Sequence, residues 1–299
     1  MSDGNALMPD GNARLFPAEI LLGWFAGQGR DLPWRHTRDP WLILVSELML
    51  QQTQAARVVP KYEAFLRRFP TVGSCARSGV GEVVTMWQGL GYNRRAVNLH
   101  RASVEVMARF AGVIPRGLDD LLSLRGIGPY TARAVQVFAF ELDVGVLDTN
   151  VARILARWEG RPLAGSEAQQ WADALVPPGR AWSWNQAMLD LGATVCSKRS
   201  PACERCPVPS TCAWAEAGSP LPDPAASTAG TSGKQSIFEG SDRQGRGRLV
   251  NALRAGPVDH VHLADAMGWP ADPARAERVA ETVVRDGLAY RMGDVWHLI

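Results

Sequence analysis

The sequence is poor in lysine and lacks long apolar segments, although its 299 residues leave room for about two domains. Lysine occurs only as Lys61, Lys198 and Lys234, so few amines could serve as a covalent nucleophile. No apolar run reaches membrane-spanning length, and the stretch from Met1 to Asn12 lacks the pattern of a secretory signal. These absences predict a cytoplasmic, nucleoid-associated protein that makes no use of a membrane.

The chain also lacks a strong excess of either charge. The formal net charge is +2, with 46% hydrophobic and 21% charged residues, which is typical of a soluble globular protein. Bulk charge therefore does not indicate a nucleic-acid partner, and such a partner has to be argued from motifs.

Cysteine is scarce except in one short loop. Four of the five cysteines follow the pattern Cys196-x6-Cys203-x2-Cys206-x5-Cys212, and Cys75 is predicted to be a core residue. Clustered thiolates in a cytoplasmic chain indicate a metal site rather than disulfides. Zinc ribbons usually carry two C-x2-C knuckles separated by a longer loop, so the unequal steps here favour a [4Fe–4S] cluster.

The stretch from Leu121 to Asn150 contains two apolar helical runs joined by Gly126-Ile127-Gly128. Glycine permits positive φ and a close approach to a partner. The backbone N–H groups of such a turn, with those of the next helix, would suit a DNA phosphate. The alternative is a simple turn between helices.

Two carboxylates are candidates for acid–base chemistry. Asp148 directly precedes the helical sequence VARILARW, where it could be an N-cap or a catalytic acid. Glu47 lies in the apolar helix predicted over Trp41 to Gln54. Loss of solvation there favours the protonated form, as a general acid requires. The alternative is that Ser46 and Glu47 mark a narrow solvated edge.

Several amides and aromatic residues are candidates for contact with bases. Gln51 and Gln52 could bind base edges or fill the gap left by a displaced base. Tyr92 follows a Gly-Leu-Gly turn and could wedge into a base stack. Trp34 and Arg35 could line a pocket or could anchor a packed loop.

The C-terminal region differs in composition from the rest. Residues 216–236 are rich in Gly, Ser, Pro and Ala and are predicted to be a flexible linker. Residues 237–299 predict three helices and a hairpin that turns at Gly293-Asp294, a small winged-helix-like module. Such a module can contact DNA or a protein partner.

Taken in order, these motifs resemble the helix-hairpin-helix DNA glycosylases and, within them, the adenine DNA glycosylase (MutY) family. The resemblance covers roughly residues 17–214 and rests on DLPWR, SELMLQQTQ, GLGYNRRAVNLH, LRGIGPYTARAV, LDTNVARILAR, NQAMLDLGA and the cysteine loop.

The resemblance implies a mostly α fold of two helical domains with a base-flipping cleft between them. Residues 31–146 would form a six-helix barrel containing the helix-hairpin-helix. Residues 13–30 and 147–215 would form the [4Fe–4S] cluster domain, with ligands Cys196, Cys203, Cys206 and Cys212.

The resemblance also assigns roles within the site. Glu47 matches the general acid, Asp148 the acid that stabilises the sugar cation, and Asn150 an active-site amide. Tyr130 stands where strand-cutting relatives carry a lysine, which a Schiff-base lyase requires. The implied substrate-binding residues are Trp34, Arg35 and Gln186 around the adenine and Gln52 and Tyr92 as intercalating residues.

The implied function is monofunctional removal of adenine mispaired with 8-oxoguanine or guanine, by base flipping and acid-assisted cleavage of the N-glycosidic bond. The expected partner is duplex DNA carrying these mispairs, bound by a monomer. Many family members end in a nudix-like domain that recognises 8-oxoguanine. The C-terminal module here is too short for one, so it either substitutes for that domain or binds a protein partner.

Two other functions fit part of the sequence. A thymine or uracil mismatch glycosylase of the same fold also carries tyrosine at the position of Tyr130, although Gln51, Gln52 and Gln186 favour adenine. A non-catalytic iron–sulfur DNA-binding regulator would use the winged module but leaves Glu47 unexplained.

Overall fold

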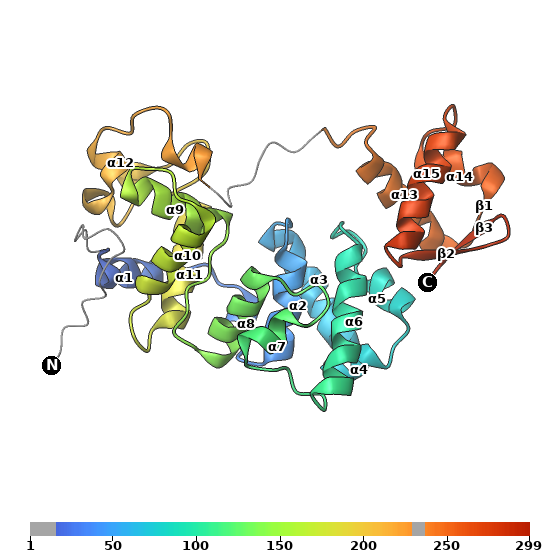
Figure 1. Ribbon diagram of the computed structural model, residues 1–299, viewed down its shortest axis with the longest axis horizontal. Helices are drawn as coiled ribbons and strands as arrows, with labels where there is room; N and C mark the ends of the chain where they lie inside the picture. The colour runs from blue at the N-terminus through green and yellow to red at the C-terminus, as the bar shows by residue number, and fades with distance from the viewer. Residues whose placement is uncertain (1–15, 229–236) are drawn as a thin grey trace. The chain divides into compact units, whose positions relative to one another are not determined.

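A computed structural model of the protein describes residues 16–228 and 237–299, and these are mostly helical (Figure 1). The chain divides into two compact units, each assembled from separated stretches of sequence. The first unit comprises Met1–Pro40, Arg116–Leu118 and Gly128–Gly233, and the second comprises Trp41–Pro115, Asp119–Ile127 and Lys234–Ile299. None of the described helices has both the length and the apolar composition needed to cross a bilayer.

The first unit is a helical body that carries the cysteine loop. Its α-helices are α1 (Ala18–Gln28), α8 (Pro129–Phe140), α9 (Thr149–Glu159), α10 (Gly165–Ala174), α11 (Ala181–Thr194) and α12 (Ala213–Glu216). Its 3₁₀ turns are η1 (Pro33–Arg35), η2 (Cys203–Arg205), η3 (Pro209–Thr211) and η4 (Pro224–Ser227).

Large aromatic side chains fill the core of the first unit. The ring centroid of Trp158 on α9 lies 5.1 Å from that of Phe16 and 5.6 Å from that of Trp171 on α10. Trp184 on α11 contacts Phe16 edge-on, with centroids 5.3 Å apart. These contacts fix the orientation of α9, whose two ends carry the functional groups described below.

A buried carboxylate ties the loop before η1 to helix α11. Asp190 is fully buried and accepts hydrogen bonds from the backbone N–H of Arg30 at 2.8 Å and from its Nε at 2.7 Å. The guanidinium of Arg35 donates to both carboxylate oxygens of Asp190, from Nη1 to Oδ2 at 2.9 Å and from Nη2 to Oδ1 at 2.7 Å. Burial alone would raise the pKa of Asp190, but the hydrogen bonds from Arg35 and Arg30 lower it below its ordinary value.

The second unit contains a helical subdomain made of α2 (Pro40–Leu50), α3 (Ala55–Arg68), α4 (Val72–Ala76), α5 (Val80–Met86), α6 (Arg94–Arg109) and α7 (Leu118–Leu122). Phe65 packs between Phe69 and Trp87, with ring centroids 4.9 and 6.1 Å away. The indole N–H of Trp41 donates to the carbonyl of Phe69 at 3.0 Å, which joins α2 to the end of α3.

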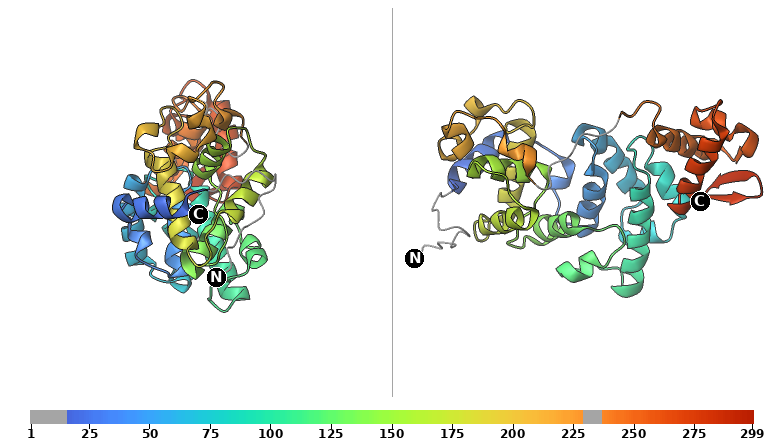
Figure 2. Two further views of the ribbon diagram at one scale, coloured as in Figure 1. Left: turned by 90° about the vertical axis from the view of Figure 1, so that its left-hand side faces the viewer. Right: turned by 45° about the horizontal axis from the view of Figure 1, so that its top comes forward.

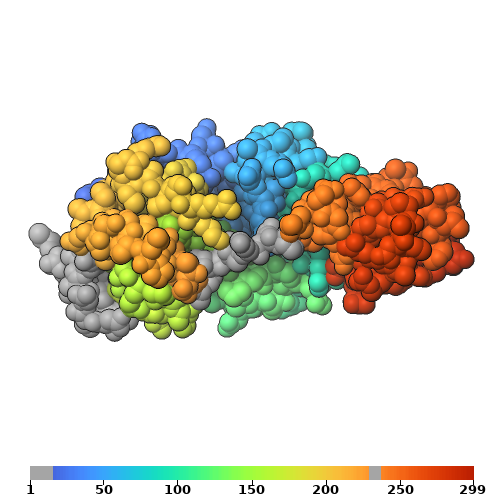
Figure 3. All heavy atoms as spheres, turned by 90° about the horizontal axis from the view of Figure 1, so that it is seen from above, coloured from blue at the N-terminus to red at the C-terminus, as the bar shows by residue number. Residues whose placement is uncertain are grey.

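The rest of the second unit is the C-terminal module, residues 237–299. It contains α13 (Asp242–Ala255), β1 (Val258–Asp259), α14 (His260–Met267), α15 (Pro273–Arg285), β2 (Ala289–Met292) and β3 (Val295–Leu298). The strands form an antiparallel sheet in the order β1-β3-β2, and the right view of Figure 2 shows the hairpin of β2 and β3 in red. The module's atoms form one continuous body in the space-filling view (Figure 3).

Most predicted elements of the module are present, with small differences. The three predicted helices are α13, α14 and α15, and the hairpin turns where expected. Strand β1 was not predicted because two residues are too short to show an alternating pattern. Its Val258 pairs with Trp296 of β3, a fully buried side chain that closes the core of the module.

Two other sequence expectations differ from the structure. The helix predicted to reach Gln54 ends at Leu50, because Gln52 adopts a left-handed conformation with φ of 55°. Part of the predicted linker is ordered, since Asp223 forms an ion pair with Arg157 of α9 at 2.6 Å. Residues 229–236 of that linker, and residues 13–15 of the predicted cluster domain, lie outside the described residues.

The contacts of Asp190 predict that its substitution lowers the free energy of unfolding. Asp190→Asn leaves the buried Arg35 guanidinium without its counter-charge, so the free energy of unfolding should fall by about 3 kcal/mol or more. The measurement is urea unfolding at neutral pH. Because the pKa is lowered in the folded state, the wild-type advantage should persist at neutral pH and be lost only as the pH falls through that lowered value.

The matched control is Glu82→Gln, which breaks the exposed ion pair between Glu82 and Arg68. Its cost should stay below about 1 kcal/mol. Equal losses in the two variants would contradict the structural role given to Asp190.

Candidate functional site

Asp148 is held at the start of helix α9 by the helix itself. It is the N-cap, and its Oδ1 accepts hydrogen bonds from the backbone N–H groups of Asn150 at 2.8 Å and Val151 at 2.7 Å. The side-chain amide of Asn150 donates to Oδ2 at 2.8 Å. The N-cap reading and the catalytic reading are therefore compatible, because capping fixes the carboxylate at one place.

The ionisation of Asp148 is a balance of opposing effects. Burial raises its pKa above the ordinary value, and this effect is the largest. The N–H groups of Val151 and Asn150 and the charge of Arg153 oppose it, because each favours the carboxylate form. The role that the resemblance implies for Asp148 requires the carboxylate form, which these hydrogen bonds favour against the effect of burial.

Arg153 connects this carboxylate to the cysteine loop. Its Nη2 donates to Asn150 Oδ1 at 2.8 Å and to the carbonyl of Gly192 at 2.7 Å, and its Nε donates to the carbonyl of Cys196 at 2.8 Å. A continuous path of hydrogen bonds thus runs from Asp148 through Asn150 and Arg153 to the first cysteine. Arg153 was not among the predicted site residues, although its position three residues after Asn150 places both on one helix face.

Gly192 on helix α11 allows this arrangement. A Cβ at this position would lie 2.6 Å from the Cβ of Asn150 and 3.2 Å from a side-chain carbon of Ile154. Only glycine lets α11 approach α9 closely enough for Arg153 to reach the Gly192 carbonyl.

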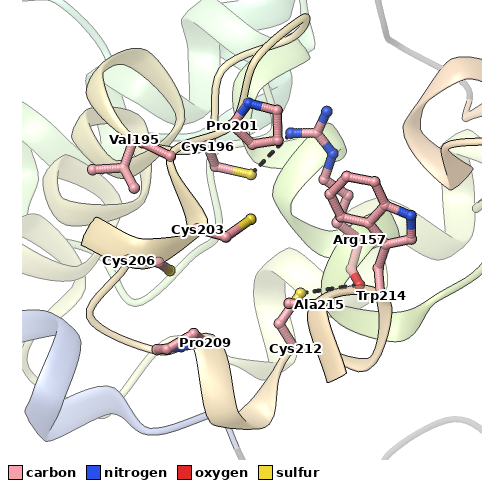
Figure 4. A pocket seen from close by; sticks show the side chains of 11 residues that line it. Arg157, Val195, Cys196, Pro201, Cys203, Cys206, Pro209, Cys212, Trp214 and Ala215 are labelled. Atoms are coloured by element: carbon pink, nitrogen blue, oxygen red, sulfur yellow. Dashed lines mark hydrogen bonds between the residues drawn. The ribbon is translucent and has the colours of Figure 1, made fainter. Parts of the chain in front are cut away.

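The four clustered cysteines surround one small hollow in the first unit (Figure 4). The hollow is also lined by Arg157, Trp214 and two prolines, Pro201 and Pro209. Among the described residues, no three metal-ligating side chains converge on a point as the ligands of a single ion do. A set of four sulfurs spread around a hollow fits a metal cluster held at several corners.

Arg157 supplies positive charge to this centre. Its side chain is buried, donates to Cys196 Sγ at 3.3 Å and to the carbonyl of Ser197 at 2.7 Å, and lies over the ring of Trp214 at 4.8 Å. Its ion pair with Asp223 orients the guanidinium from the other side. Such a cation balances the negative charge that bound thiolates would bring into the hollow.

Burial raises the pKa of Cys206 to about 11 and also raises the pKa values of Cys203 and Cys212. The thiols therefore stay protonated unless a metal replaces the protons. This is the chemistry expected of ligands whose ionisation is coupled to metal binding.

Glu47 lies in the second unit, on helix α2. Its side chain is only 4% exposed, and Ile43, Leu44 and Leu48 around it on the helix are buried. The solvated-edge alternative is therefore wrong, since Ser46 is buried as well. Glu47 and Asp148 belong to different compact units, and their convergence on one nucleotide stays a prediction.

The two loops that carry Gln52 and Tyr92 are built around Arg95. Both Gln52 and Tyr92 have positive φ, 55° and 46°, and Tyr92 is 43% exposed. Arg95 is buried, and its guanidinium donates to the carbonyls of Leu48, Met49 and Gln51 on one side and of Leu90 and Gly91 on the other. Burial lowers its pKa to about 10, so it stays charged at neutral pH. Arg95 was not among the predicted site residues, because its acceptors are backbone carbonyls and the Thr53 hydroxyl, which no sequence motif marks.

The predicted phosphate-binding turn has one left-handed glycine. Gly126 has φ of 80°, and a Cβ there would lie 2.5 Å from the Cβ of Asn98. Gly128 instead has an extended conformation and precedes α8 as its N-cap, with Pro129 at the first helical position. Only Gly126 of the two glycines therefore uses the positive φ that glycine permits. Ile127, between them, is buried.

The remaining predicted residues all lie in the first unit. Trp34 and Gln186 are buried, while Tyr130 is half-buried near the start of α8. Arg35 forms a structural ion pair with Asp190, which supports the loop-anchor alternative for this residue. Asp190 itself was missed. It lies in the quoted stretch NQAMLDLGA, and a lone acid among apolar residues of a helix was the available signal.

The contacts of Arg157 make a prediction about the metal centre. Arg157→Ala removes the hydrogen bond to Cys196 and the partner of Asp223, so metal should be retained about 10-fold less tightly or worse. The measurement is metal content and visible absorbance of anaerobically purified protein during chelator challenge. Arg199→Ala, an exposed arginine of the same loop, is the control and should behave as wild type. Unchanged retention in Arg157→Ala would refute the role.

Comparison with known proteins gives a consistent result. Residues 45–174 match the family model described as HhH-GPD superfamily base excision DNA repair protein. The chain is 40% identical over 280 residues to an adenine DNA glycosylase of Mycolicibacterium smegmatis, covering 92% of each chain. It is also 40% identical over 207 residues to that of Homo sapiens, covering 64% of this chain and 38% of the human protein.

Solved structures confirm the predicted fold class. The structure of a thermostable thymine-DNA glycosylase aligns with a TM-score of 0.62 and 30% identity, over 67% of this chain and 95% of that chain. An endonuclease III trapped on DNA aligns with a TM-score of 0.58 at 22% identity, which shows a shared fold. With relatives similar along nearly its whole length and a matching helical fold, the chain belongs to the adenine DNA glycosylase family of the HhH-GPD superfamily.

Proposed function

We propose that the protein is a monofunctional DNA glycosylase that removes adenine mispaired with 8-oxoguanine or guanine in duplex DNA. The observation that carries the proposal is the likeness to named adenine DNA glycosylases over 92% of the chain. The site residues can supply the chemistry of this reaction. We also propose that the protein is located in the cytoplasm.

The reaction needs a protonated acid near the base and an ionised carboxylate near the sugar, and the two groups require different environments. Adenine becomes a good leaving group when its ring is protonated, and Glu47, buried among apolar neighbours, is the proposed proton donor. The bond from the sugar to N9 breaks, and its electron pair leaves with the base. The oxocarbenium-like sugar is stabilised by the carboxylate of Asp148, and water then adds to the sugar carbon.

The absence of a suitable amine supports hydrolysis without strand cleavage. A lyase step through a Schiff base needs a lysine at the site. The three lysines all lie outside the stretch from Leu121 to Asn150, and Tyr130 occupies the position at which strand-cutting relatives carry the amine. The product is therefore an abasic site in an intact strand.

The proposed cofactor is a [4Fe–4S] cluster held by Cys196, Cys203, Cys206 and Cys212. The donor set fits, because four sulfurs line one hollow and Arg157 provides a compensating charge. The cluster would supply structural cross-linking of the loop when bound. The chain's own residues then transmit the position of that loop to α9 through Arg153.

A thymine mismatch glycosylase is the second candidate, favoured by the 30% identity to the thermostable thymine-DNA glycosylase. The deciding experiment compares base release from duplexes containing A:8-oxoguanine, A:G, T:G and U:G pairs under single-turnover conditions. Adenine release from the first two is expected. Release of thymine or uracil alone would overturn the substrate assignment.

Glu47→Gln tests the acid role in the same assay. The variant should bind the duplex normally but lose excision by about 10²-fold or more, the usual contribution of general acid catalysis. Glu63→Gln, an exposed glutamate of α3, is the matched control. Unchanged excision by Glu47→Gln would refute the acid role. Duplex binding without base release by the wild type would instead favour a regulator without catalysis.

The contacts of Asp148 predict a pH dependence. Since the carboxylate must be ionised, the single-turnover rate should fall as the pH drops through its raised pKa. Asn150→Ala removes a donor that favours the charged form, so the acid limb of the pH–rate profile should move to higher pH. Thr149→Ala, an exposed neighbour, should leave the limb in place. An unmoved limb in Asn150→Ala would contradict the assigned contact.

A further inference from the structure

A second hollow, of about 780 Å³, lies entirely within the second unit. One wall is made by the loops of Gln52 and Tyr92, and the other by helix α13 of the C-terminal module. None of the motifs in the family resemblance reaches α13, which begins at Asp242. The role of this wall is therefore open.

The lining of the hollow is strongly basic. It includes six arginines, namely Arg57, Arg94, Arg95, Arg243, Arg246 and Arg254, and a single carboxylate, Asp286. Asp286 pairs with both Arg94, at 3.2 Å, and Arg246, so its charge is already engaged. The lining residues thus carry six positive charges and one negative charge, a balance that suits a polyanion.

The two walls are fastened to each other. The Nη2 of Arg254 on α13 donates to the carbonyl of Val84 at 2.8 Å and to Oδ1 of Asn93 at 3.1 Å. The shared contacts of Asp286 with Arg94 and Arg246 form a second link. Arg94, Arg246 and Arg254 are thereby held in place before any ligand arrives, which lowers the ordering cost of binding.

Aromatic and amide groups interleave with these charges. Tyr92 is 43% exposed and Phe238 57% exposed, and Arg243 lies 5.8 Å from the Phe238 ring centroid. Gln52 is exposed on its left-handed turn. A basic wall facing an amide and an aromatic is a combination suited to a sugar–phosphate backbone with bases beside it.

We propose that this hollow, the α13 groove, binds the phosphodiester backbone of the duplex next to the base that Gln52 and Tyr92 reach. The C-terminal module thus extends the DNA-binding surface, with Arg57 and Arg243 as phosphate contacts from opposite walls. This inference rests on the proposed function. An acidic protein partner is disfavoured, because the same hollow contains the residues predicted to enter the base stack.

The test is the salt dependence of duplex binding by the full-length, cluster-loaded protein. Arg57→Ala combined with Arg243→Ala should weaken binding at low salt by about 10-fold or more. The slope of log Kd against log salt concentration should fall by about one for each arginine lost. Neutral methylphosphonate linkages placed one at a time should weaken wild-type binding at specific positions and have less effect on the double variant.

The control removes the same charge elsewhere in the same unit. Arg67→Ala combined with Arg285→Ala alters exposed arginines of α3 and α15 that do not line the groove. Melting temperatures of both double variants should match that of the wild type. Equal slopes for the two double variants, or no position-specific methylphosphonate effect, would overturn the proposal.

Different results would refute the groove assignment and the proposed function. Adenine release by the wild type, measured in the duplex panel, tests the function alone. If adenine is released but the groove variant binds as the control does, only the groove assignment is wrong. If no base is released, the salt slopes on duplex DNA still decide whether α13 contacts phosphates.

Discussion

The hydrogen bonds of helix α9 are the constraint on which the first unit depends. Asp148 caps its first turn, and Arg153 and Arg157 project from one face, four residues apart. Arg153 holds Asn150 and the carbonyl of Cys196, while Arg157 holds Cys196 Sγ. One rigid helix, locked by Trp158 in the core, therefore positions both the proposed catalytic carboxylate and the cysteine loop. Disturbance of the loop should reach Asp148 through two side chains.

The second unit uses a buried arginine in a similar way. Arg95 satisfies carbonyl groups of two loops at once, so the loops of Gln52 and Tyr92 keep their left-handed turns without regular secondary structure. Arg254 of α13 likewise donates a hydrogen bond to the helical subdomain, at the carbonyl of Val84. Arg95 is stabilised by several backbone carbonyls, and Arg254 by the carbonyl of Val84 and the amide oxygen of Asn93. These charges cost free energy to bury, and their hydrogen bonds fix loop positions that apolar packing alone would leave free.

Much of the site could be predicted from local sequence because its chemistry is local. The four cysteines lie within one loop, Asp148 caps the helix that follows it, and Glu47 sits among apolar residues of its own helix. The missed residues act over long separations. Asp190 meets Arg35 across 155 positions, and Arg153 meets Cys196 across 43. No periodicity or motif identifies such pairs, since a pattern within one segment does not specify a partner in another.

The sequence by itself determined the helical class, the family, the loop of four cysteines and the three-helix module with its hairpin. These follow from spacing, periodicity and residue type, which act over a few turns of chain. Tertiary structure alone decided that Arg35 anchors a loop to Asp190 and that residues before 229 pack on α9 through Asp223. It also decided that α13 faces Gln52 and Tyr92 across an arginine-lined hollow. Those outcomes depend on which distant groups satisfy each buried charge, and only the folded chain brings such groups together.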